Sequence, residues 1–119
     1  MEKFRGTKDI DVRETVVYKI QMLTVRQTDE FATWLAGLKD SSARTRILAR
    51  IDRLAVGNAG DAEPVGEGVS EMRIHYGAGY RVYFVQRGTV LVVILAGGTK
   101  KTQGKDIRTA IKLAKTLET

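Results

Sequence analysis

The sequence contains no cysteine, only one histidine and only one proline in 119 residues. Without cysteine neither a disulfide nor a thiolate metal site can form, and one histidine cannot build a histidine-based metal cluster. No stretch approaches the roughly 18 consecutive apolar residues of a membrane span, and the N-terminal residues lack the apolar core of a signal peptide. These absences predict a cytoplasmic protein that uses no metal or other cofactor and does not contact a membrane.

Hydrophobic residues make up 43% of the chain, which is typical of a globular protein rather than a disordered one. The length suits one domain and is too short for two. Residues 1–14 have mixed charge and little periodicity, so we expect them to form a flexible N-terminal extension. Residues 15–119 are then expected to form a single domain.

The net charge of +6 is unevenly distributed along the chain. Residues 68–119 carry nine basic and three acidic side chains, whereas residues 29–67 carry five basic and seven acidic ones. A local excess of positive charge is typical of proteins that bind nucleic acid or an acidic protein partner. Charge alone does not choose between these two kinds of partner.

The spacing of apolar residues predicts an α+β fold with the element order β-α-α-β-β-β-α. We expect a strand within residues 15–26, an αα-hairpin that begins at Asp29, a loop over residues 57–67 and a C-terminal helix that begins at Gln103 or Asp106. Between the loop and the last helix, three antiparallel strands are expected. They span residues 71–76, 80–85 and 90–96.

The first two of these three strands alternate apolar and polar residues, so their register decides which side chains meet. The two apolar rows share one face only if paired residue numbers sum to an even value. A three-residue loop over residues 77–79, which contains two glycines, satisfies this condition by pairing Tyr76 with Tyr80. One face of the hairpin is then expected to be core and the other polar.

The expected polar face places Arg73 opposite Tyr83 and His75 opposite Arg81. Neighbouring guanidinium groups repel each other unless an anion or carboxylate partners lie close by, and Glu71 is the only acid between residues 68 and 106. The pattern therefore favours a phosphate-binding face. The alternative is an ordinary solvated sheet face, whose arginines pair loosely with acids from the helices.

Several segments of the chain resemble a known family. They are FATWLAGLKD (31–40), EMRI (71–74), GYRVYF (79–84), GGTKKTQ (97–103) and DIRTA (106–110). Together they are similar to the RelE/ParE superfamily of toxins from type II toxin–antitoxin modules, and within it to the HigB-like addiction module killer proteins. The resemblance implies a twisted antiparallel sheet flanked by helices.

The resemblance also implies an activity and its residues. HigB-like and RelE-like toxins are mRNA endoribonucleases (mRNA interferases) that need no metal, act on the ribosome and arrest growth by inhibiting translation. By position, Arg73, Arg81 and Lys100 match their catalytic residues, and Lys101 lies beside them as a further catalytic or RNA-binding residue.

The resemblance leaves two roles and one alternative open. Many mRNA-cleaving members carry a histidine or a C-terminal tyrosine near the end of the sheet, where this chain has Gly97 and Gly98. His75 and Tyr83 are therefore candidate catalytic or RNA-binding substitutes. The ParE branch of the superfamily instead inhibits DNA gyrase without nuclease activity, and an inactive module that binds antitoxin or RNA is a third possibility.

The resemblance implies partners as well. A toxin of this kind is silenced by an acidic antitoxin encoded next to it, whose carboxylates would suit the basic face. Operator DNA would be bound only through that antitoxin, and mRNA would be met on the ribosome.

Overall fold

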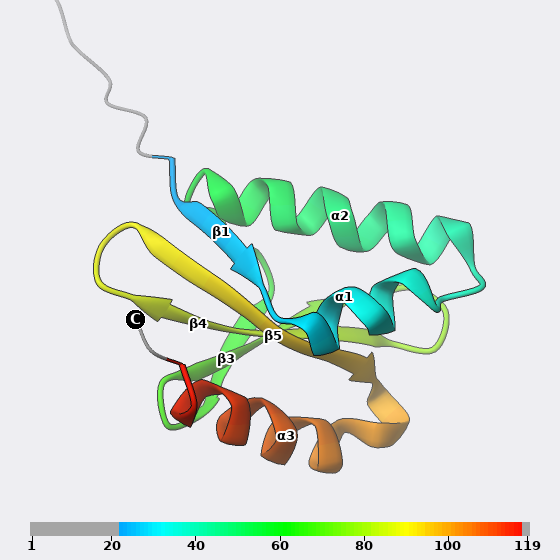
Figure 1. Ribbon diagram of the computed structural model, residues 1–119. Helices are drawn as coiled ribbons and strands as arrows, with labels where there is room; N and C mark the ends of the chain where they lie inside the picture. Colours follow the sequence, from blue (N-terminus) through cyan, green and yellow to red (C-terminus); the bar gives the residue numbers. More distant parts are fainter. Residues whose placement is uncertain (1–21, 118–119) are drawn as a thin grey trace, which may run out of the picture.

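The computed structural model describes residues 22–117 and shows an α+β fold in which three helices cover a five-stranded sheet (Figure 1). The elements are β1 (Thr24–Gln27), α1 (Asp29–Ala36), α2 (Ser41–Ala55), β2 (Ala62–Gly66), β3 (Val69–Ile74), β4 (Tyr80–Arg87), β5 (Leu91–Thr99), a 3₁₀ turn η3 (Lys100–Thr102) and α3 (Gln103–Lys115). No helix in this range is long and apolar enough to cross a membrane. The expected N-terminal extension, and the expected strand up to residue 21, lie outside the described residues.

The sheet has the strand order β1-β5-β4-β3-β2. The three pairings among β2, β3, β4 and β5 are antiparallel, but β1 runs parallel to β5 with Thr24 beside Leu91. The expectation of an antiparallel sheet is therefore wrong at this edge. The two helices that follow β1 cross one face of the sheet. As a result β1 and β5, which are far apart in the sequence, lie side by side and run in the same direction (Figure 1).

The expected loop over residues 57–67 is only partly a loop, because its second half forms β2. This strand pairs with β3 and places Glu63 opposite Glu71. Pro64 lies within it, which is tolerated because β2 is the edge strand and a proline there needs no ladder hydrogen bond. The order β-α-α-β-β-β-α is therefore corrected to β-α-α-β-β-β-β-α.

The β3–β4 register differs from the expected one, although its parity is the same. Arg73 pairs directly with Arg81, and Ile74 pairs with Tyr80. The connection runs from residue 75 to residue 79, because Tyr76 leaves the ladder: its N–H donates to the Ile74 carbonyl at 2.9 Å. The expected pairs Arg73–Tyr83 and His75–Arg81 are thus wrong.

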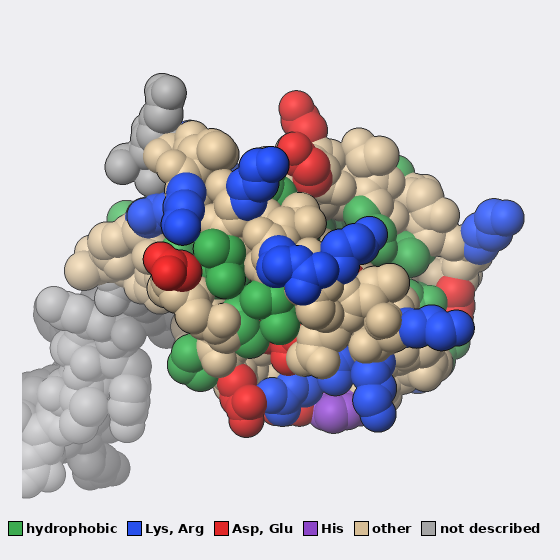
Figure 2. Space-filling model, turned by 90° about the horizontal axis from the view of Figure 1, so that it is seen from below, with side chains coloured by type: hydrophobic (Ala, Val, Ile, Leu, Met, Phe, Trp, Pro, Cys, Tyr) green, Lys and Arg blue, Asp and Glu red, His purple; other side chains and the backbone are tan. Residues whose placement is uncertain are grey.

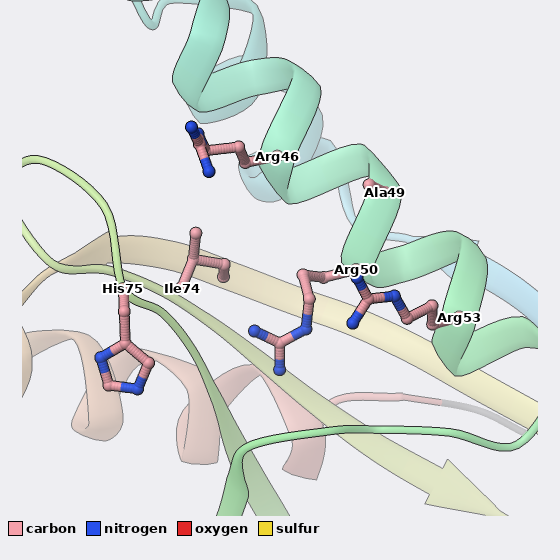
Figure 3. Close-up of a pocket in the computed structure, with 6 residues that line it drawn as sticks. All are labelled: Arg46, Ala49, Arg50, Arg53, Ile74 and His75. Carbon is pink, nitrogen blue, oxygen red and sulfur yellow. The ribbon is translucent and has the colours of Figure 1, made fainter.

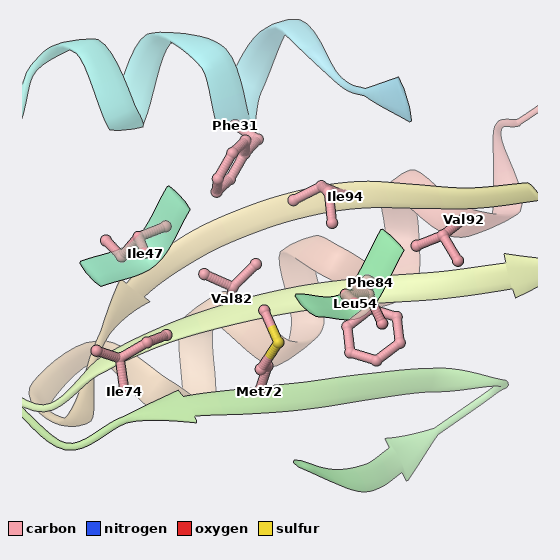
Figure 4. Packing of buried hydrophobic residues seen from close by; sticks show 9 residues of the cluster. All are labelled: Phe31, Ile47, Leu54, Met72, Ile74, Val82, Phe84, Val92 and Ile94. Atoms are coloured by element: carbon pink, nitrogen blue, oxygen red, sulfur yellow. The ribbon is translucent and has the colours of Figure 1, made fainter. Parts of the chain in front are cut away.

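Both faces of the sheet are covered. One face packs under α1 and α2 through an apolar cluster (Figure 4). It consists of Phe31, Ile47, Leu54, Met72, Ile74, Val82, Phe84, Val92 and Ile94. The other face, which includes Tyr83 and Leu95, packs against Ala110 and Ala114 of α3. The polar residues of β3 and β4 therefore lie beside a helix rather than on a fully open sheet.

Local contacts fix α1 to the end of β5. Thr28 caps α1 by accepting a hydrogen bond from the Phe31 N–H at 3.0 Å, and its hydroxyl donates to the Leu95 carbonyl at 2.6 Å. The Trp34 ring lies against Gly97 so closely that a Cβ there would be 2.3 Å from ring carbons. The absence of a side chain at Gly97 therefore lets α1 approach the sheet.

Candidate functional site

A buried carboxylate lies at the centre of the polar cluster on the α3 face of the sheet. Glu71 is only 1% exposed. Its Oε2 accepts hydrogen bonds from the Tyr83 hydroxyl at 2.9 Å and from Nε2 of Gln103 at 2.8 Å. The Nε atoms of Arg73 and Arg81 lie 3.3 Å and 3.5 Å from its two oxygens. Glu71 therefore joins β3, β4 and the first residue of α3 through one group.

Arg73 is surrounded by carboxylates. Besides Glu71, its guanidinium lies 3.2 Å from Asp61 and 2.5 Å from Glu63. The hydrogen bond with Glu63, followed by the one with Glu71, raises the pKa of Arg73 above its ordinary value. The expectation that internal acids would be scarce is wrong, because β2 brings acids from the presumed loop alongside β3. Arg73 is thus largely neutralised within the protein.

Arg81 has fewer partners than Arg73. Its side chain is 13% exposed, and its only carboxylate contact within residues 22–117 is the 3.5 Å approach of Nε to Glu71. Its Nε is buried and makes no hydrogen bond in that range, so the contact with Glu71 is an ion pair alone. Its two Nη atoms make no hydrogen bond within residues 22–117 but, unlike Nε, are not among the buried polar atoms that lack a partner. Arg81 is therefore the guanidinium of this pair that retains hydrogen-bond donors for an anion.

Tyr83 lies beneath α3 with no exposed surface, so its expected position on an open face is wrong. Burial, and then the hydrogen bond with Glu71, raise the pKa of its hydroxyl above the ordinary value. A buried phenol that donates to a carboxylate cannot stack on a nucleic-acid base. Tyr83 instead donates a hydrogen bond to Glu71 from the interior beneath α3.

His75 lies in the exposed β3–β4 loop, not opposite Arg81. Its Nε2 lies 2.5 Å from Oδ2 of Asp61, which also pairs with Arg73. The hydrogen bond with His75, together with the charge of Arg73, lowers the pKa of the Asp61 carboxyl. The single histidine is visible at the rim of the molecule among basic and acidic side chains in Figure 2. The structure thus places it at the edge of the polar cluster.

Lys100 and Lys101 form the 3₁₀ turn directly after β5 and are exposed. The turn is close to Arg81 along the sheet, because Arg81 pairs with Gly98 at the end of β5. The Lys100 N–H also donates to the Ala78 carbonyl at 3.4 Å, so the turn lies beside the β3–β4 loop. Neither lysine forms an ion pair within the described residues. Arg81 and the two lysines therefore gather at one end of the sheet, as expected.

Two polar residues that the sequence interpretation did not select complete this end of the sheet. Gln103, considered only as a helix start, donates to Glu71. Asp106 is buried and accepts a hydrogen bond from the Thr102 hydroxyl, and a Cβ on Gly98 would collide with its carboxylate. The sequence signal for the close approach of Asp106 was the pair Gly97–Gly98 at the end of β5, because a backbone that a neighbouring side chain approaches closely commonly requires glycine.

Within residues 22–117, no group of three or more histidine, aspartate or glutamate side chains is arranged to hold a metal ion. The acids near the cluster are instead engaged by arginine, histidine, tyrosine and glutamine donors.

The chain is similar in sequence to a known family and to a bacterial protein. Residues 33–118 match the family described as Phage derived protein Gp49-like (DUF891). A Haemophilus influenzae protein described as uncharacterized is 46% identical over 95 residues, which cover 80% of this chain and 96% of that protein.

Similarity to solved structures is weaker. The toxin–antitoxin complex RelBE2 from Mycobacterium tuberculosis gives a TM-score of 0.45 at 23% identity, with 69% of this chain and 95% of that chain covered. A conserved hypothetical protein from Helicobacter pylori gives 0.47 at 16% identity, with 67% and 97% covered.

Proposed function

The chain belongs to the Gp49-like family of phage-derived proteins, and we propose that it is the toxin of a type II toxin–antitoxin pair that arrests growth by cleaving mRNA. The motifs shared with RelE/ParE toxins support this proposal, in particular GYRVYF in β4 and GGTKKTQ at the end of β5. The family match covers both segments.

One observation carries the proposal. The guanidinium of Arg81 is held from its buried side by Glu71, while its Nη atoms make no hydrogen bond within the described residues. Lys100 and Lys101 extend from the adjacent strand end, where neither forms an ion pair with a carboxylate of residues 22–117. A guanidinium fork with nearby ammonium groups suits a phosphodiester, because it can donate two parallel hydrogen bonds and neutralise charge.

The proposed reaction is attack of a ribose 2′-oxygen on the adjacent phosphorus, which forms a 2′,3′-cyclic phosphate and releases the 5′-oxygen. The 2′-hydroxyl loses a proton, and the leaving 5′-oxygen gains one. Arg81 would stabilise the extra negative charge of the transition state, and Lys100 or Lys101 would orient the phosphate and exchange the proton. Arg73 would act as a positioning residue, because its charge is already compensated.

The partners follow from the same surface. We expect mRNA to be bound on the ribosome, and an acidic antitoxin to cover Arg81 and the two lysines in the silenced state. Operator DNA would be bound only through the antitoxin. Co-expression with the neighbouring reading frame, followed by pull-down, tests for this partner, and absence of any complex would count against it.

A second candidate function is binding without cleavage, which includes ParE-like inhibition of DNA gyrase. The observation that favours it concerns proton transfer. Tyr83 is buried and His75 contacts Asp61 at the rim, so neither of the two expected substitutes reaches the Nη side of Arg81. Of the candidate residues named from the sequence, this leaves the two lysines for proton transfer at that end of the sheet.

Overexpression separates the two functions. Growth arrest with mapped 5′ ends inside translated mRNAs would support the ribonuclease. Growth arrest with intact transcripts and accumulated gyrase–DNA cleavage complexes would support the alternative. No growth arrest by the wild-type protein would overturn both, and an Arg81→Ala variant that is folded yet fully toxic would remove Arg81 from the site.

A further inference from the structure

A second cationic site lies on the other face of the sheet, between α2 and the end of β3. Three arginines at helical spacing on α2 line a pocket of 390 Å³ there, with His75 on the opposite wall (Figure 3). The lining residues are Arg46, Ala49, Arg50, Arg53, Ile74 and His75.

Arg50 is a fixed part of the pocket wall. Its guanidinium donates to the backbone carbonyls of Arg73 at 2.5 Å, Ala59 at 2.9 Å and Asp61 at 3.4 Å. Burial, and then the positive charge of the neighbouring Arg53, lower the pKa of Arg50, as expected where cationic side chains lie close together. Arg50 therefore holds a positive charge in place and ties α2 to β3 at the same time.

Arg46 and Arg53 are exposed, and neither forms an ion pair within residues 22–117. The guanidinium carbon of Arg46 lies 4.4 Å from the centre of the ring of Tyr76, a residue of the β3–β4 loop, so this pocket-lining guanidinium is held over an aromatic face. Tyr76 is itself held by a 3.1 Å hydrogen bond from its hydroxyl to Asp40. Two guanidinium groups that form no ion pair with a described residue thus line the same pocket, and one of them is held over an aromatic ring.

The acid near this pocket is already engaged. Asp61 contacts both His75 and Arg73, and its charge also acts on Arg50, but it forms no ion pair with Arg46 or Arg53. It also links the two cationic sites, because His75 lines the pocket while Arg73 belongs to the Glu71 cluster. The pocket and the cluster therefore meet around the end of β3.

We propose that this pocket is a second phosphate subsite, which binds the backbone of single-stranded RNA at a nucleotide other than the one held at Arg81. The inference rests on the proposed function and extends it by naming where the rest of the RNA is held. Arg46 and Arg53 supply forked donors for a phosphate, and the plane of the Arg46 guanidinium, held over Tyr76 on one side, offers its other side as a surface on which a base stacks. The pocket volume suits a ligand of nucleotide size.

The test measures binding of a fluorescent 2′-O-methyl oligouridylate, which cannot be cleaved through its own 2′-oxygen, at several salt concentrations. Arg46→Gln and Arg53→Gln should each weaken binding and reduce the slope of log affinity against log salt by about 0.7, as expected for one lost phosphate contact on a single strand. Lys112→Gln, which removes an exposed charge from α3, is the charge-matched control and should leave the slope unchanged. Arg50 is not substituted, because its backbone contacts support the fold.

Three outcomes would overturn the proposal. The first is a salt slope in both arginine variants equal to that of the wild type. The second is an equal loss of slope in Lys112→Gln, which would show that only the net charge of the protein matters. The third is an oligoglutamate peptide that binds the wild type but not these variants while RNA affinity is unchanged, since the occupant would then be an acidic protein segment. Growth arrest by the wild-type protein is measured separately, so failure of this subsite is distinguishable from failure of the toxin proposal.

Discussion

Glu71 and Arg81 lie on neighbouring strands with the carboxylate Oε2 3.5 Å from the guanidinium Nε. The same oxygen accepts hydrogen bonds from Tyr83 and Gln103, so its position is fixed by β4 and α3 as well as by β3. The guanidinium is thereby oriented from its buried side, and its two Nη donors make no hydrogen bond within the described residues. This contact makes Arg81 both fixed and available, as an anion-binding arginine must be.

Replacing Glu71 should destabilise the fold strongly. Glu71→Ala would leave the Tyr83 hydroxyl and the Arg73 Nε without their buried acceptor and would remove the ion-pair partner of Arg81, and breaking a buried ion pair costs about 3–5 kcal/mol. Chemical denaturation measures the change in the free energy of unfolding. The control is Glu63→Ala, which removes another carboxylate from Arg73 but one whose side chain is 63% exposed, and which should cost about 1 kcal/mol or less. Equal losses in the two variants would show that Glu71 is not the centre of the cluster.

A methyl group at residue 97 should also destabilise the protein. The Cβ of Gly97→Ala would lie 2.3 Å from carbons of the Trp34 ring, so α1 or β5 must shift, at about 1–3 kcal/mol. Gly104→Ala is the matched control, because its Cβ meets nothing closer than 3.7 Å and alanine favours the helix by up to about 1 kcal/mol. Thermal unfolding should therefore give a lower midpoint for the first variant and an unchanged or higher one for the second. A stable Gly97→Ala protein would contradict the close packing of α1 on β5.

The Asp61 carboxyl should titrate below its ordinary pKa of 3.8, because it is hydrogen-bonded to His75 and close to Arg73. A pKa that is lower in the folded state means that the ionised form stabilises the fold. This contribution is present above the unfolded pKa and is lost as the pH falls through the lowered folded value.

Carboxyl-carbon NMR measures this titration directly. His75→Ala removes the largest cause of the shift, so it should move the Asp61 midpoint up toward its ordinary value. An unchanged midpoint in this variant would show that His75 and Asp61 do not interact in solution.

The sequence was sufficient to predict most of the elements and the parity of the central hairpin, because alternation of apolar residues allows only even pairings. It was not sufficient for the register itself. Tyr76 was expected to continue the strand. It still packs against the apolar cluster, but it leaves the ladder, and its hydroxyl and ring contact Asp40 and Arg46 near the start of α2. Such a contact between distant segments leaves no periodic signal in the chain.

The sequence predicted in part where the candidate residues lie in the fold, whereas their roles stay predictions. Arg73, Arg81, Lys100 and Lys101 lie at the expected end of the sheet, and their residue types and the strand pattern gave the signal. What the sequence did not reveal is how the charges are compensated. Arg73 is neutralised by acids from a segment interpreted as a loop, and Gln103 reaches Glu71 across 32 positions of the chain. Those pairings depend on the tertiary arrangement of β2 and α3.

The most direct test of the account compares cleavage of ribosome-bound mRNA by the wild-type protein, Arg81→Lys and Lys112→Gln, with the fold of each variant checked by circular dichroism. Lysine keeps the charge at residue 81 but loses the guanidinium fork and the Nε contact with Glu71. We expect cleavage by the wild type and by Lys112→Gln. In Arg81→Lys the cleavage rate should fall by about 100-fold or more, as it does when one transition-state hydrogen-bond donor is removed. Undiminished cleavage by a folded Arg81→Lys protein would contradict it.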